Sequence, residues 1–185
     1  MGKELVSIII PVFNRVDFLV DAVNCAVNQT YENLEVIIID NKSTDGTWNK
    51  AIELQNIFKD KVKIYQNSEN IGPVLNWKRG IEYACGEYIK LLFSDDIIEL
   101  NFIEETMHIF TEDCAFVMSG IKIIDSSTKN IISTSKFQYI SSINSDEYIK
   151  DILYSHSFGF PVSPGCAIFR KNDAQNNLST NIPNT

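Results

Sequence analysis

The sequence has few cysteines and histidines, and this shortage argues against two kinds of stabilised fold. Its 185 residues include only 4 cysteines and 2 histidines. The cysteines form no CxxC pair and have no histidine cluster beside them, so neither a zinc site nor a disulfide framework is expected. We expect all four to be reduced and mostly buried, as in a cytoplasmic protein: Cys25, Cys85, Cys114 and Cys166.

A long apolar run is also absent. The longest stretch near the N-terminus, residues 6–13, is interrupted by Ser7 and Pro11. It is far shorter than the ~20 residues that a membrane-spanning helix needs. No signal peptide precedes it, and no basic amphipathic stretch argues for membrane contact. We therefore expect a cytoplasmic location, with peripheral contact at the inner face of the membrane left open.

Basic residues are in the minority. There are 16 Lys and Arg against 24 Asp and Glu, a net charge of −8. No basic face of the kind that binds a phosphate backbone is present, which argues against a nucleic-acid partner. With 44% hydrophobic residues the chain can build one core. We predict a single domain over residues 1–171, followed by a polar tail over residues 172–185 that leads into a missing C-terminal segment.

Strand and helix patterns alternate over the first hundred residues. Short β-branched runs predict buried strands, and apolar residues at helical spacing predict amphipathic helices between them. Ser43 or Thr44 is expected to cap the second helix, whose inner face would carry Trp48, Ala51 and Ile52. The strands are predicted at residues 6–11, 34–39, 62–65 and 88–93, and the helices at residues 16–29, after 44, and 74–84.

This βαβα alternation predicts an α/β fold: a doubly wound, mainly parallel sheet with helices on both faces. Beyond residue 97 the patterns are weaker. There we predict helices at residues 101–110 and 145–154, and strands at residues 115–124, 130–134 and 166–170.

Carboxylates gather where ligands bind in such a sheet. If the strand order is 3-2-1-4, the ends of strands 1, 2 and 4 converge at the switch point. Neither GxGxxG nor GxxxxGK[ST] follows strand 1. Instead Asp40 and Asp45 follow strand 2, and Asp95 and Asp96 follow strand 4. Paired carboxylates suit a hard divalent cation; the alternative is a solvated acidic turn that caps the next helix.

Several motifs follow one another along the chain: VSIIIPVFN at residues 6–14, NQTY at 28–31, IIDNKSTDGT at 38–47, NIG at 70–72, GI at 80–81, ACGEYI at 84–89 and SDD at 94–96. In this order they resemble the motifs of the family 2 glycosyltransferases of GT-A fold, which is Rossmann-like. The resemblance covers residues 6–100 strongly and residues 101–170 faintly.

The resemblance implies a donor site. The loop after strand 1 would hold the nucleotide base, Asp40 would contact the base, and Asp95 and Asp96 would bond the ribose and a Mn²⁺ or Mg²⁺ ion that grips the diphosphate. The implied nucleotide-sugar-binding residues are Pro11, Phe13, Asn14, Arg15, Asp40, Asp45, Thr47, Asn70, Gly72 and Asp95, and the implied metal ligands are Asp96 and Asp95.

The implied reaction moves a sugar, with inversion, from a nucleoside diphosphate donor to an acceptor hydroxyl. A UDP-sugar is the expected donor and a glycan or glycolipid the expected acceptor, in cell-surface polysaccharide or glycolipid synthesis. The general base is not identified; the weak candidates are Asp173 and His156. We therefore predict the donor-binding part of a longer enzyme.

Some positions depart from the family pattern. Asn41 stands where a second Asp is usual, Lys42 replaces a common Gly, and Phe93 stands where many members have another Asp. The alternative interpretation is a non-catalytic nucleotide- or sugar-binding module, or a scaffold with the same fold. A sugar-nucleotide pyrophosphorylase would need a glycine-rich, basic loop after strand 1, which is absent here.

Overall fold

The computed structural model describes residues 4–125, 127–135, 142–144 and 163–173. They belong to two compact units, one within Met1–Val117 and Ile168–Thr185 and the other within Met118–Ala167. The helix predicted at residues 145–154 and the candidate His156 lie outside the described residues. The division into one domain and a tail stays a prediction.

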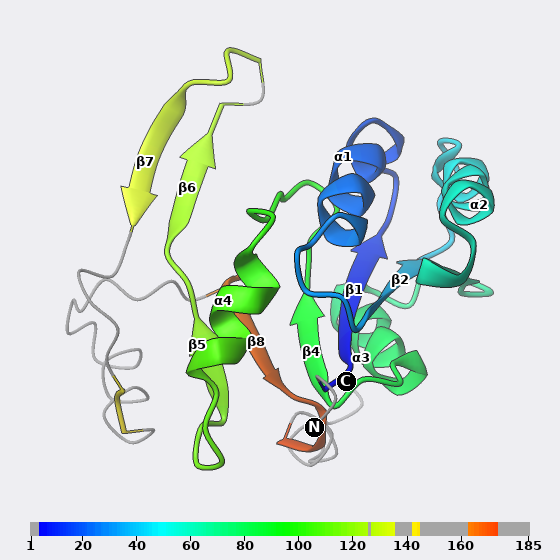
Figure 1. The fold of residues 1–185 in the computed structure, drawn as a ribbon. Coiled ribbons are helices and arrows are strands. Elements are labelled where there is room, and N and C mark those ends of the chain that lie inside the picture. The colour runs from blue at the N-terminus through cyan, green and yellow to red at the C-terminus, as the bar shows by residue number, and fades with distance from the viewer. Residues whose placement is uncertain (1–3, 126, 136–141, 145–162, 174–185) are drawn as a thin grey trace, which may run out of the picture. The chain divides into compact units, whose positions relative to one another are not determined.

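A six-stranded sheet forms the centre of the first unit, in the order β3-β2-β1-β4-β8-β5. The strands β1 to β4 pair in parallel, and β8 pairs antiparallel with β4. The mainly parallel sheet is therefore confirmed, and the order 3-2-1-4 that the switch-point argument assumes is the one observed (Figure 1). The bounds are β1 Val6–Val12, β2 Leu34–Asp40, β3 Val62–Gln66, β4 Tyr88–Leu91, β5 Phe116–Met118 and β8 Ala167–Arg170.

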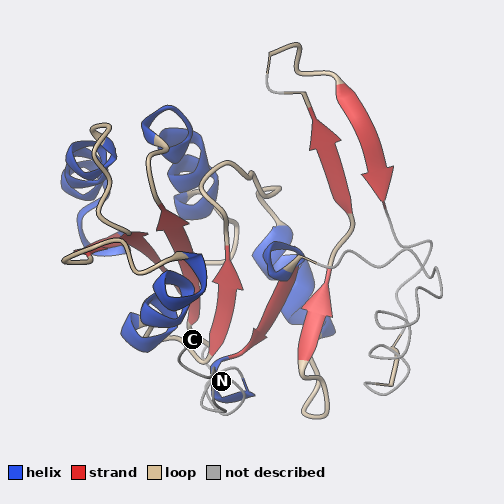
Figure 2. Ribbon diagram, turned by 180° about the vertical axis from the view of Figure 1, so that it is seen from behind, coloured by secondary structure: helices blue, strands red, loops and turns tan. Residues whose placement is uncertain are grey.

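Helices cover both faces of this sheet. One buried cluster joins α1, α2 and α4 to the side chains of Ile8 and Ile38, and a second joins α3 to Ile9 and Ile37. The alternation of neighbouring isoleucines between the two clusters is what a strand buried on both faces requires. The bounds are α1 Val16–Val27, α2 Thr47–Phe58, α3 Pro73–Tyr83 and α4 Phe102–Ile109, with short 3₁₀ turns at Lys59–Lys61 and Pro164–Cys166. Figure 2 shows the sheet from the side opposite to Figure 1.

The close approach of α3 to the sheet depends on a small residue. A Cβ atom at Gly80 would lie 2.4 Å from Cγ2 of Ile9. Glycine costs a helix interior about 1 kcal/mol relative to alanine. Because Gly80 has no side chain, the backbone of α3 can pack directly on β1.

Three local predictions were wrong. The helix α2 begins at Thr47 after Gly46, which has φ 96°, and neither Ser43 nor Thr44 caps it. The side chain of Ile52 is 38% exposed and does not face the core. The strand predicted at residues 115–124 is two strands, because the chain leaves β5 and forms β6 Ile121–Ile124, which pairs with β7 Ile131–Ser135 in a separate two-stranded sheet.

The last described strand is firmly attached to the first unit. Arg170 donates hydrogen bonds to the backbone carbonyls of Thr111 at 2.7 Å and Cys114 at 3.1 Å, and to the Tyr88 hydroxyl at 3.0 Å. The backbone N–H of Lys171 donates to the carbonyl of Glu87 at 2.8 Å. These bonds fix the end of β8 beside the start of β4.

The four cysteines are free thiols, as predicted. Cys25 and Cys166 are buried, whereas Cys85 is exposed. Among the described residues, no helix has the length and apolar character needed to cross a membrane.

Candidate functional site

The carboxyl ends of the parallel strands lie at one edge of the sheet. Val12 at the end of β1 pairs with Asp40 at the end of β2, and Asp40 pairs with Gln66 at the end of β3. The backbone N–H of Leu92, just after β4, donates to the carbonyl of Ile9. The last residues of these strands and the loops that follow them carry every predicted donor-site residue, as expected for a switch point.

Two of these loops are bonded to each other. The N–H of Asn14 donates to the Ser43 hydroxyl at 2.9 Å, and the N–H of Thr44 donates to Oδ1 of Asn14 at 2.8 Å. Asn14 has φ 52°, a left-handed conformation that asparagine tolerates better than most residues. The loops after β1 and β2 therefore form one bonded wall.

Asp45 and Thr47 complete this wall with hydrogen bonds to the backbone at the starts of α1 and α2. Oδ2 of Asp45 accepts the N–H of Val16 at 3.2 Å, and Oδ1 accepts the N–H of Thr47 at 3.0 Å and its hydroxyl at 2.5 Å. The Thr47 hydroxyl in turn accepts the N–H of Arg15 at 3.0 Å. Desolvation raises the pKa of Asp45, but the hydrogen bonds from Thr47 and Val16 outweigh it and hold the pKa below its usual value.

Asp40 is fully buried at this edge. Its carboxylate accepts the hydroxyl of Ser43, the N–H of Ser43 at 3.1 Å and Nε2 of Gln66 at 2.7 Å. In the structure Asp40 therefore holds the turn that carries Ser43. Contact with a nucleotide base stays a prediction for this residue.

Asn70 and Gly72 lie in the loop that connects β3 to α3, just before α3 begins. Oδ1 of Asn70 accepts the N–H of Gly72 at 2.9 Å and Nδ2 of Asn41 at 2.7 Å. Gly72 has φ 80°, a conformation that side chains rarely adopt. Asn70 is exposed, whereas Asn41 is buried.

Asp95 and Asp96 lie in the turn after β4, and both are exposed. Nε of Arg15 lies 4.0 Å from Oδ2 of Asp95, which brings the loop after β1 to the acidic pair. Desolvation raises the pKa of Asp96, and the neighbouring negative charge of Asp95 raises it further against the opposing charge of Lys90. A cation at this point would relieve the repulsion between the two carboxylates.

The acidic pair suits a divalent cation that takes its other ligands from the substrate and from water. In the part of the chain that the structure describes, no three His, Cys, Asp or Glu side chains gather as a metal cluster. Two carboxylates alone do not enclose an ion, but Mg²⁺ is commonly bound by one or two carboxylates together with substrate phosphates and water. The donor set therefore suits an ion that arrives with a phosphate ligand.

The structure does not bring Asp173 to this edge. Because β8 is antiparallel to β4, with Arg170 opposite Tyr88, the chain after β8 continues past the start of β4. Asp173 therefore lies at the opposite edge from Asp95. His156 is outside the described residues, so neither candidate for the general base is placed at the site.

A cavity of about 150 Å³ lies elsewhere. It is lined by Glu4, Tyr31, Glu104, Met107 and His108. Glu4 precedes β1 and Tyr31 precedes β2, so this cavity is near the strand starts. None of the predicted site residues lines it.

Some polar residues that support the site are not predicted from the sequence. The sequence suggests Ser43 only as a helix cap, yet in the structure it connects Asp40 to Asn14. The position of Gln66 at the end of a third parallel strand is a sequence signal that points to it. Asn67, which is buried and bonded to Asn41, gives no comparable signal, because its partner belongs to the loop after another strand.

The chain is similar to glycosyltransferases in sequence and in structure. The family model described as Glycosyl transferase family 2 matches residues 7–177. TuaG of Bacillus subtilis (strain 168), which carries the name of a teichuronic acid biosynthesis glycosyltransferase, is 31% identical over 66% of this chain and 48% of its own length.

Two solved structures share the fold. S. aureus TarS 1-349 in complex with UDP-GlcNAc aligns with a TM-score of 0.68 and 21% identity, over 93% of this chain and 47% of that one. The mannosyltransferase PcManGT from Pyrobaculum calidifontis, in complex with GDP-Man and Mn²⁺, aligns with a TM-score of 0.58 and 19% identity, over 62% of this chain and 34% of that one.

The chain spans only part of the length of its curated relatives. It covers 60% of one of them and 18% of another. The family-model match over residues 7–177 contains all four loops of the candidate site.

Proposed function

The chain belongs to glycosyl transferase family 2, and on this premise we propose that it transfers a sugar from a nucleoside diphosphate donor to an acceptor hydroxyl group. The observation that carries the proposal is the open Asp95–Asp96 pair at the edge where β1 and β2 also end, with Arg15 4.0 Å from Asp95. An acidic pair beside a cation suits a diphosphate that arrives with a metal ion.

The donor is proposed to lie against the bonded loops after β1 and β2. Phe13 is 41% exposed and offers an aromatic surface to a base, while Pro11 and Asn14 shape the loop that carries it. Asp40, buried at the end of β2, is the proposed contact for the nucleotide base. Asp45 and Thr47 support the wall, and Asn70 and Gly72 border it on the side of α3.

The phosphates are proposed to lie near the end of β4. Asp96 and Asp95 would hold a Mn²⁺ or Mg²⁺ ion, which when bound supplies a Lewis acid for the charge that develops on the leaving diphosphate. Arg15 is half-exposed, so its guanidinium has room to leave Asp95 and pair with a phosphate oxygen. A planar guanidinium matches phosphate oxygens well.

The finer proposals concern the donor, the acceptor and the pathway. A UDP-sugar is the proposed donor, in line with the UDP-GlcNAc complex of TarS. Transfer with inversion to a glycan or glycolipid acceptor is proposed, and the name of TuaG supports a role in cell-surface polysaccharide synthesis. The general base remains unassigned among the described residues, and the cytoplasmic location stays a prediction.

Calorimetric titration tests the donor site. We expect UDP to bind the 185-residue chain in the presence of Mn²⁺, and GDP to bind more weakly. Chelation of the metal and the Asp96→Ala substitution should each weaken UDP binding by about tenfold or more, because both remove the ion that links the acidic pair to the diphosphate.

Asp113→Ala is the matched control, since it removes one carboxylate from the exposed turn after α4, far along the chain from the pair. Failure of every nucleoside diphosphate to bind would contradict the proposal. A turnover assay then separates the two remaining interpretations: metal-dependent UDP binding without transfer from any UDP-sugar favours a non-catalytic binding module.

A further inference from the structure

Asn41 departs from the family pattern, and the structure gives this residue a role that the proposed function leaves open. It follows Asp40 directly and is 3% exposed. Its N–H donates to the carbonyl of Val12 at 2.9 Å. Its side chain lies between the ends of β2 and β3 and reaches the turn that begins α3.

The side-chain amide of Asn41 uses both its ends on this turn. Oδ1 accepts the N–H of Ile71 at 3.0 Å, and Nδ2 donates to Oδ1 of Asn70 at 2.7 Å. The N–H of Gly72 donates to the same oxygen of Asn70 at 2.9 Å. Three consecutive residues of the turn are therefore bonded, directly or through one oxygen, to Asn41.

The network continues below Asn41 into the sheet. Nδ2 of Asn67 donates to Oδ1 of Asn41 at 2.9 Å and to Oδ1 of Asn76 at 2.8 Å. Nδ2 of Asn76 donates to the carbonyl of Ile39 at 3.1 Å. Asn67 and Asn76 are 4% and 3% exposed, so these bonds lie in surroundings where an unmade bond is costly.

An aspartate could not replace Asn41 in this network. A carboxylate has no hydrogen to donate, so the Asn70 amide would have to turn its own Nδ2 toward position 41. That rotation would present a donor to the N–H of Gly72, which is itself a donor. The turn would lose one of its two anchors whichever way Asn70 points.

We propose that Asn41 is a positioning residue for the nucleotide: its amide fixes the turn Asn70–Gly72 at the edge of the donor site. This inference rests on the proposed function, since it takes Asn70 and Gly72 as the border of that site. Asn41 acts on nucleotide affinity through the turn and has no part in holding the metal ion, which belongs to the loop after β4.

The test compares two isosteric substitutions in the 185-residue chain. Asn41→Asp removes the donor to Asn70, whereas Asn76→Asp adds the same charge at the same degree of burial but leaves residues 70–72 bonded to Asn41. Titration with UDP at saturating Mn²⁺ should give a Kd about tenfold higher for Asn41→Asp. For Asn76→Asp the Kd should stay within about threefold of the parent, even where its melting temperature falls.

Two further measurements separate positioning from general destabilisation. The ratio of UDP affinities with and without Mn²⁺ should be unchanged by Asn41→Asp, and the Gly72 amide should exchange its hydrogen faster than in Asn76→Asp. Asn41→Ser, which is neutral and too short to reach Asn70, should weaken UDP binding in the same way. If Asn41→Asp does not fold, UDP binding by Asn41→Ser tests the positioning role instead.

The outcomes distinguish this inference from the proposed function. If the parent chain binds no UDP with Mn²⁺, the proposed function fails, and the inference fails with it. If the parent binds but Asn41→Asp or Asn41→Ser binds as tightly as Asn76→Asp, the positioning role is wrong and the donor site stands.

Discussion

Asp45 shows how one side chain can organise two loops. Its two oxygens accept the first N–H groups of α1 and α2, at Val16 and Thr47. Those helices start at the same edge because each follows a parallel strand. A carboxylate at two helix N-termini also interacts favourably with both helix dipoles. The sequence Asp45-Gly46 is typical of an ordinary turn, but in the structure Asp45 connects two loops of the site.

Replacement of Asp45 by alanine should lower the free energy of unfolding by about 1–2 kcal/mol, a loss comparable with that of removing a side-chain acceptor from a helix N-terminus. The reason is that the N–H groups of Val16 and Thr47 lose their partner. Urea denaturation at pH 7 measures the change. Thr44→Ala is the control, because the bond of Thr44 to Asn14 is made by its backbone N–H; an equal loss in both variants would contradict this role of Asp45.

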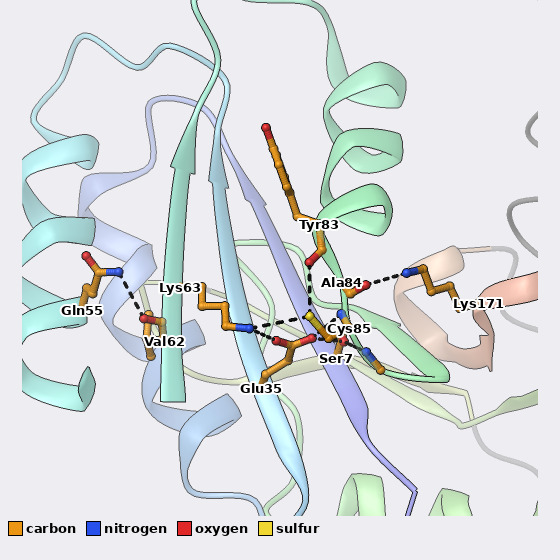
Figure 3. A network of polar contacts seen from close by, with 10 residues as sticks. Ser7, Glu35, Gln55, Val62, Lys63, Tyr83, Ala84, Cys85 and Lys171 are labelled. Atoms are coloured by element: carbon orange, nitrogen blue, oxygen red, sulfur yellow. Dashed lines mark hydrogen bonds and ion pairs between the residues drawn. The ribbon is translucent and has the colours of Figure 1, made fainter. Parts of the chain in front are cut away.

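The elements of the sheet are also tied together at the edge away from the site. Glu35 in β2 accepts the Ser7 hydroxyl of β1 at 2.6 Å, Nζ of Lys63 in β3 at 2.7 Å and the N–H of Cys85 before β4 at 2.6 Å. Gly86 donates its N–H to the Ser7 hydroxyl at 2.8 Å. Figure 3 shows Ser7, Lys63 and Cys85 around the Glu35 carboxylate. One buried carboxylate therefore joins three strands and the turn that leads into the fourth.

Burial raises the pKa of Glu35, but the bonds from Lys63, Ser7 and Cys85 outweigh it and leave the pKa below its ordinary value. A carboxyl whose pKa is lower in the folded than in the unfolded state stabilises the fold above the unfolded pKa. That stabilisation is lost as the pH falls through the folded pKa. The Lys63 side chain is 42% exposed, so solvent screening reduces the energy that this ion pair contributes.

Glu35→Gln should therefore be less stable than the parent chain by about 1–3 kcal/mol at pH 7. The difference should shrink as the pH falls toward 3, because the stabilisation by a carboxyl with a lowered pKa is lost on acidification. Urea denaturation at the two pH values measures both differences. Glu53→Gln is the matched control: Glu53 pairs with Lys50 but is 60% exposed, so its loss should cost less than about 0.5 kcal/mol at either pH. A difference for Glu35→Gln that does not depend on pH would contradict this account.

Local sequence patterns predict some elements of the fold, whereas contacts between distant residues determine others. The four strands and the helices between them follow from helical spacing and from β-branched runs such as Val36–Ile39. The order of the strands does not follow from these local patterns. The start of α2 does not follow, because Ser43 is bonded to Asp40 and Asn14 instead of capping a helix. The antiparallel pairing of β8 depends on residues more than seventy positions earlier, which no local pattern reports.

The candidate site divides in the same way. Asp95 and Asp96 are visible in the sequence because they follow an apolar strand directly. The sequence predicts no role for the motif at residues 28–31, but the structure shows one for Gln29. Its Nε2 donates to the carbonyl of Glu99 at 2.9 Å, and its Oε1 accepts the N–H of Ile103 at 3.0 Å. These bonds hold the segment that follows the acidic pair. Such support can be recognised only when the chain is folded, because about seventy residues separate the partners.

All candidate donor residues lie in the first compact unit, while the chain between β5 and β8 belongs to the second. Nucleotide binding should therefore tolerate a cut in the turn between β6 and β7. A site-specific protease sequence inserted between Thr128 and Lys129 provides the cut, since surface turns accept insertion and nicking. The two fragments should stay together, because β8 remains paired with β4 and Arg170 keeps its bonds to Thr111, Cys114 and Tyr88.

Size-exclusion chromatography without denaturant should show the two fragments eluting together, and the cut protein should bind UDP with Mn²⁺ within about threefold of the uncut protein. Arg170→Ala in the same cut protein should promote separation, since it removes three hydrogen bonds that hold β8 to the first unit. Loss of UDP binding while the fragments remain associated would place part of the donor site in the second unit. Separation of the unmutated fragments would show that β8 is held mainly by the continuous chain, and not by its contacts with β4 and the turn after α4.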